Sequence, residues 1–87
     1  MNTTPQEERV LSVAALWADL LPFNPPETYR LNLWEMSHGL EVVLHAIKEV
    51  SLKRVKLGGD MTREQAIRLV GAIACSVSRR KRHLAAV

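Results

Sequence analysis

The sequence predicts an all-α fold, a three-helix antiparallel bundle with a long central helix. Apolar residues recur at the helical period in three segments, and residues typical of helix ends separate these segments. No run of alternating apolar and polar residues indicates a strand. With 87 residues, 47% of them hydrophobic, the chain has room for one domain at 1–87. Its helices are expected at about 5–21, 26–57 and 62–84.

The first helix begins with Thr4-Pro5-Gln6-Glu7, which combines an N-cap threonine, proline at the first helical position and glutamate at the third. It ends at Pro22, because proline cannot continue a helix. Apolar residues cover roughly 220° of its circumference. This helix therefore needs neighbours on more than one side.

The second helix is the long one, expected between the proline pair after Asn24 and the Gly58-Gly59 turn. Asn24 followed by Glu27 repeats the capping pattern. Large apolar residues follow a three-four spacing along this helix: Leu33, Met36, Leu40, Val43, Ile47, Val50 and Leu57. Gly39 interrupts the helix and indicates a kink, a close helix crossing or a break into two helices. These three alternatives stay open.

The third helix begins with a capping box, in which Thr62 is the N-cap and Gln65 the reciprocal partner. The short glycine turn before it predicts an antiparallel pair with the second helix. The expected core face is Ile67, Val70, Ile73, Ala74, Val77 and Leu84. Arg80 and Lys81 fall on the same face, so the packed part should end near Val77.

The helices carry more apolar surface than a bundle of this size is expected to bury, since a domain this small buries only about 60–65% of its chain surface. Part of the surplus lies on the charged side of the second helix. One interpretation is that it belongs to the core. The other is a docking surface, with tryptophan as the natural anchor, completed by a second copy or a larger protein. The residues expected to form it are Trp17, Leu31, Trp34, His38 and Val42.

The third helix is strongly basic. The formal net charge is +3, yet no acidic residue follows Glu64. The cations that suggest contact with nucleic-acid phosphates are Arg68, Arg79, Arg80, Lys81 and Arg82. The competing interpretation is a solvated helix end whose cations favour the macrodipole.

No pattern in the chain indicates catalysis. Cys75 has no histidine at helical spacing beside it, and no glycine-rich phosphate loop is present. A stripe of His38, Glu41, His45 and Glu49 has the residue types of a metal site, but the other helices offer no matching ligands. We therefore expect no enzyme activity, no cofactor, no metal and no small-molecule substrate.

The sequence thus favours a non-catalytic interaction module, a regulator or inhibitor such as an antiactivator or adaptor. The alternative is a nucleic-acid-binding protein, as a small transcriptional regulator or ribonucleoprotein subunit. A homodimer fits either role. No apolar run is long enough to cross a bilayer, and a single cysteine suits a reducing compartment, so a cytoplasmic location is expected.

Overall fold

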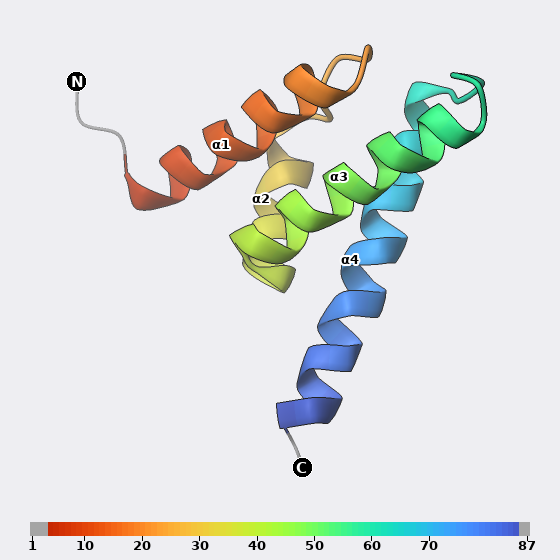
Figure 1. Ribbon diagram of the computed structural model, residues 1–87. Helices are drawn as coiled ribbons and strands as arrows, with labels where there is room; N and C mark the ends of the chain where they lie inside the picture. Colours follow the sequence, from red (N-terminus) through yellow and green to blue (C-terminus); the bar gives the residue numbers. More distant parts are fainter. Residues whose placement is uncertain (1–3, 86–87) are drawn as a thin grey trace.

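The computed structural model describes residues 4–85, with side chains up to residue 81. This part of the chain is all-helical and contains no strand. The described residues form four helices, not the expected three, and Figure 1 shows how they are arranged. They are α1 (Pro5–Leu20), α2 (Thr28–His38), α3 (Leu40–Lys56) and α4 (Arg63–Ala85).

The prediction of one long central helix is wrong because the chain breaks at Gly39. This residue has φ 88° and ψ 157°, a conformation that is essentially restricted to glycine. Its N–H donates to the Glu35 carbonyl at 2.8 Å and ends α2, and its own carbonyl accepts from the Val43 N–H at 3.2 Å as α3 begins. The expected start at residue 26 is also wrong. The N-cap of α2 is Glu27, with no side-chain hydrogen bond, and Asn24 lies outside the helix.

The other predicted helix ends are confirmed. Thr4 Oγ1 accepts a hydrogen bond from the Glu7 N–H at 3.1 Å. The capping box is complete, because Thr62 Oγ1 accepts from the Gln65 N–H at 3.1 Å and Gln65 Oε1 accepts from the Thr62 N–H at 2.9 Å. The turn between α3 and α4 places Gly58 and Gly59 at φ 70° and 84°.

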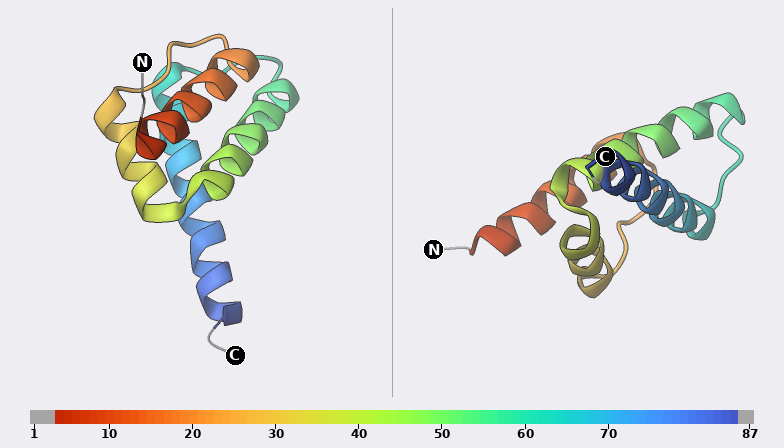
Figure 2. Two further views of the ribbon diagram at one scale, coloured as in Figure 1. Left: turned by 90° about the vertical axis from the view of Figure 1, so that its left-hand side faces the viewer. Right: turned by 90° about the horizontal axis from the view of Figure 1, so that it is seen from below.

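The helices pack around α2 and α3. Within the described part, α1 and α4 each contact both α2 and α3 but do not pack against each other. From the glycine turn, α4 packs back against α3 and then continues beyond the other helices, as the left view in Figure 2 shows. The last partly buried member of the core on α4 is Val77. Arg80 and Lys81 are exposed, as expected for the part outside the bundle.

The two tryptophans lie next to each other in the core. Trp17 is fully buried, and its ring centroid lies 6.5 Å from that of Trp34. The indole Nε1–H of Trp17 donates to the Phe23 carbonyl at 2.9 Å, so its polar group is satisfied inside the protein. The other large, fully buried side chains come from α1, α3 and α4: Val13, Val43, Ile47, Val50 and Val70.

The break at Gly39 also changes which face of α2 points inward. Leu33 and Met36, which belong to the expected apolar seam, are 57% and 74% exposed. Leu31 and Trp34, which lie off that seam, are buried. A single seam requires one continuous helix. Because the chain breaks at Gly39, the face of α2 that points to the core is not the continuation of the apolar face of α3.

Arg63, the first residue of α4, ties this helix to the linker between α1 and α2. Its Nε donates to the Asn24 carbonyl at 2.9 Å and its Nη2 to the Pro25 carbonyl at 2.8 Å. We expect Arg63→Ala to lower the free energy of unfolding by about 1–2 kcal/mol, because two hydrogen bonds from a charged group are lost. Urea denaturation followed by circular dichroism measures this change. Arg68→Ala, at an exposed position of the same helix, is the control, and an equal loss in both variants would contradict the role of Arg63.

Candidate functional site

The structure places the predicted docking residues inside the molecule. Trp17, Leu31, Trp34 and Val42 are at most 7% exposed and belong to the hydrophobic core. His38 is half-buried at the end of α2. The apolar surplus at these positions is thus core within a single chain, and the exposed apolar surface lies elsewhere.

Three exposed apolar residues lie on the outer side of α2. Tyr29, Leu33 and Met36 are 61%, 57% and 74% exposed. Their spacing of four and then three residues aligns them along one face of the helix, opposite Leu31 and Trp34. We call these three residues the α2 stripe. The sequence analysis missed the α2 stripe because the three-four spacing assigned Leu33 and Met36 to the core.

Two further exposed apolar residues, Leu52 and Val55, lie on the outer side of α3. They are three residues apart, and the exposed Lys48 and Lys56 flank them. The exposed Leu57 follows them at the C-cap of α3, and charged residues interrupt this area.

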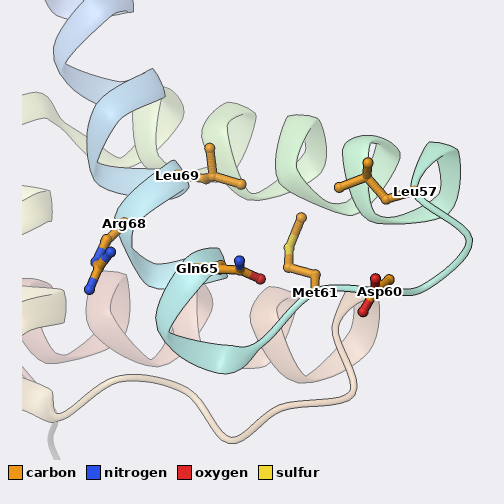
Figure 3. Close-up of a pocket in the computed structure, with 6 residues that line it drawn as sticks. All are labelled: Leu57, Asp60, Met61, Gln65, Arg68 and Leu69. Atoms are coloured by element: carbon orange, nitrogen blue, oxygen red, sulfur yellow. The ribbon is translucent and has the colours of Figure 1, made fainter.

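A hollow of about 300 Å³ lies at the turn between α3 and α4. Figure 3 shows Asp60 and Arg68 toward its two ends, with Met61 and Gln65 between them. Leu57 and Leu69 complete an apolar wall. Because the two charged groups do not converge on one point, the hollow lacks the arrangement of an acid–base pair.

Packing brings together three polar residues that the sequence kept apart. Cys75 Sγ lies 3.8 Å from His38 Nε2, and His38 Nδ1 lies 2.8 Å from Ser78 Oγ. The sequence argument considered only histidines at helical spacing from Cys75 on its own helix, so it did not reveal this contact. Spacing along one chain segment carries no signal for such a contact, which links the end of α2 to α4.

The predicted stripe of histidines and glutamates is divided by the break at Gly39. His38 turns toward α4, while His45 Nε2 pairs with Glu49 Oε1 at 3.9 Å on α3. In the part of the chain that the structure describes, no three His, Cys, Asp or Glu side chains are close enough together to hold a metal ion. The buried carboxylate of Glu35 is engaged by Arg9 Nη1 at 3.5 Å, across α1 and α2.

The predicted phosphate-binding residues that the structure describes all lie on the surface of α4. They are Arg68, Arg79, Arg80 and Lys81, which we call the α4 cations. Arg82 and the predicted core residue Leu84 lie beyond the described side chains. Among the described residues, no carboxylate forms an ion pair with any of the α4 cations. Arg68 and Arg79 are eleven residues apart, three helical turns, and so lie on the same face.

Comparison with known proteins gives no matching family, no matching curated protein and no matching solved structure. The functional argument therefore depends on the surfaces themselves. None of the helices in the described part is both long and apolar enough to span a bilayer.

Proposed function

We propose that this protein is a non-catalytic interaction module that docks on a larger protein through the α2 stripe. The observation that supports this role is the alignment of Tyr29, Leu33 and Met36 on the solvent side of a helix whose other side is already buried. Positions i, i+4 and i+7 are the anchors by which a helix enters an apolar groove. The role that fits is that of a cytoplasmic regulator or inhibitor, such as an adaptor or antiactivator.

The size of the stripe favours a larger partner over a second copy. Its three side chains expose an area on the order of 300 Å². A stable interface needs about 800 Å² from each partner. A flat contact between two such stripes falls well short of that area. A groove also encloses the sides of α2 and so buries more surface for the same three anchors.

The test requires the partner to be captured at the stripe. A photoreactive phenylalanine analogue in place of Tyr29 should crosslink the partner in cells that naturally produce this protein. The partner is then purified, and its dissociation constant is measured by calorimetry. Leu33→Asp with Met36→Asp should weaken binding at least about 100-fold, because each anchor of an interface contributes about 2 kcal/mol or more. Both positions are exposed, so the fold should be retained.

A matched control is available on α3. Leu52→Asp with Val55→Asp introduces the same two charges at equally exposed apolar positions and should change the dissociation constant less than about threefold. Equal loss in both double variants, or none in the α2 variant, would refute docking by the stripe. Sedimentation is the second measurement. A dimer of the wild type that the α2 substitutions dissociate would show that a second copy, not a larger protein, occupies the stripe.

A further inference from the structure

We infer that α4 is a binding site for double-stranded DNA, with the α4 cations on the phosphates. This surface is separate from the α2 stripe and does not depend on it. The charge of α4 is the first observation. No acidic residue follows Glu64 in the sequence, and no described carboxylate pairs with the α4 cations. An uncompensated row of cations favours a polyanion as its partner.

The position of Arg68 distinguishes this inference from a simple solvated helix end. The macrodipole favours cations in the last turn of a helix, and this accounts for cations near the C-terminal end of α4. Arg68 lies in the second turn of α4, which begins at Arg63. A cation so near the N-terminal end gains nothing from the macrodipole. Its exposed place in line with Arg79 therefore has no support from the macrodipole, and the nearest acidic residue on the helix is Glu64, one turn before it.

The spacing of these two arginines fits the major groove. Eleven residues of helix rise about 16 Å, while the major groove of B-form DNA is about 12 Å wide and admits one α-helix. The exposed residues between the two arginines include Ala72, Cys75 and Ser76, which are all small. On this face an arginine at each end can reach a phosphate on either side of the groove, with the ring of His38 from α2 beside Cys75.

The C-terminal end of α4 is open to such an approach. Ser78 Oγ still contacts His38 Nδ1 of α2 at 2.8 Å, and after it the end of α4 extends past the other helices, as the left view of Figure 2 shows. Arg79, Arg80 and Lys81 lie in this free part and are exposed. This free end can approach a duplex without a collision with the bundle, whereas Arg68 lies where α4 still packs against α2 and α3.

The amino-acid composition of α4 favours double-stranded DNA over single strands and duplex RNA. Its 23 residues include no phenylalanine, tyrosine or tryptophan, and stacking on aromatic side chains is a main source of affinity for single strands. The major groove of A-form RNA is too narrow and deep for protein side chains to read. Duplex DNA therefore fits α4 better than a single strand or duplex RNA does.

Fluorescence anisotropy tests the inference with the full chain and a labelled 20-base-pair DNA duplex between 50 and 200 mM salt. With four phosphate contacts, the slope of log K against log salt should be about −3.6, and the dissociation constant near physiological salt about 10⁻⁴–10⁻⁶ M. The variant Arg68→Gln with Arg79→Gln should make the slope shallower by about 2 and weaken binding at least about tenfold at 50 mM salt.

The matched control, Lys48→Gln with Lys53→Gln, removes the same charge from exposed positions on α3 and should change affinity less than about threefold. The variant Leu33→Asp with Met36→Asp shows whether the two surfaces act separately. It should have at most a small effect on DNA binding, since it leaves α4 intact. No binding at 50 mM salt, or equal losses in the arginine and lysine variants, would overturn the inference. Tighter binding to the single strand, to duplex RNA or to polyglutamate than to the DNA duplex would overturn it as well.

Discussion

Trp17→Ala should lower the free energy of unfolding by about 3–5 kcal/mol, the range for truncating a buried aromatic residue. Trp17 is 0% exposed, its ring packs near Trp34, and its indole donates to the Phe23 carbonyl. The substitution opens a cavity at this junction and leaves the carbonyl without its donor. A chain of this length has a total stability of roughly 4–13 kcal/mol. Much of the variant should therefore be unfolded in urea concentrations that the wild type withstands.

Urea denaturation followed by circular dichroism measures this loss. Leu52→Ala is the control, since Leu52 is 56% exposed and its truncation should cost less than about 1 kcal/mol. Trp34→Ala should also destabilise the fold, because Trp34 is only 7% exposed and packs near Trp17. A Trp17→Ala protein within 1 kcal/mol of the wild type would contradict the described core.

Gly39→Ala should lower the free energy of unfolding by about 1–3 kcal/mol. No atom lies within 4 Å of the position that a Cβ would occupy, so the cost does not come from a clash. It comes from the backbone, because φ 88° with ψ 157° is essentially a glycine conformation. The midpoint of thermal or urea unfolding reports the change.

Gly71→Ala provides a comparison of opposite sign. Gly71 lies inside α4, and a Cβ there would meet Trp34 Nε1 at 3.7 Å, an ordinary contact. Alanine is favoured over glycine within a helix by about 1 kcal/mol, so this variant should be as stable as the wild type or more stable. If both alanine variants were stabilised, the chain would not break at Gly39, and α2 and α3 would form the continuous helix that the sequence first indicated.

The features that the sequence predicted correctly are local. The cap at Thr4, the capping box at Thr62 and Gln65, and the Gly58-Gly59 turn each depend on a few adjacent residues. Their hydrogen bonds form wherever the helix ends, regardless of what packs against it. The end of the packed part of α4 near Val77 also followed from local pattern, because Arg80 and Lys81 interrupt the apolar face.

The features that the sequence missed depend on how helices meet. On α2, Leu33 and Met36 form one apolar face, and Leu31 and Trp34 form the opposite one. Spacing alone cannot say which face is buried. The break at Gly39 lets α2 turn independently of α3. As a result Leu31 and Trp34, expected on the docking surface, are buried, and Leu33 and Met36, expected in the core, are exposed. The contact between His38 and Cys75 was missed for the same reason, since it joins two helices.

Along α4, the residues that pack into the core come first and the cluster of cations follows, in the part that extends past the bundle. Val77 is the last described residue that packs into the core, and the cluster of cations begins two residues later at Arg79. Residues 79–87 contain Arg79, Arg80, Lys81 and Arg82, so their removal takes the formal net charge from +3 to −1. A single trypsin-like cut after Arg79 separates most of this charge from the chain. The described core remains whole, and the formal net charge of the folded remainder falls from +3 to 0, because Arg80, Lys81 and Arg82 are lost.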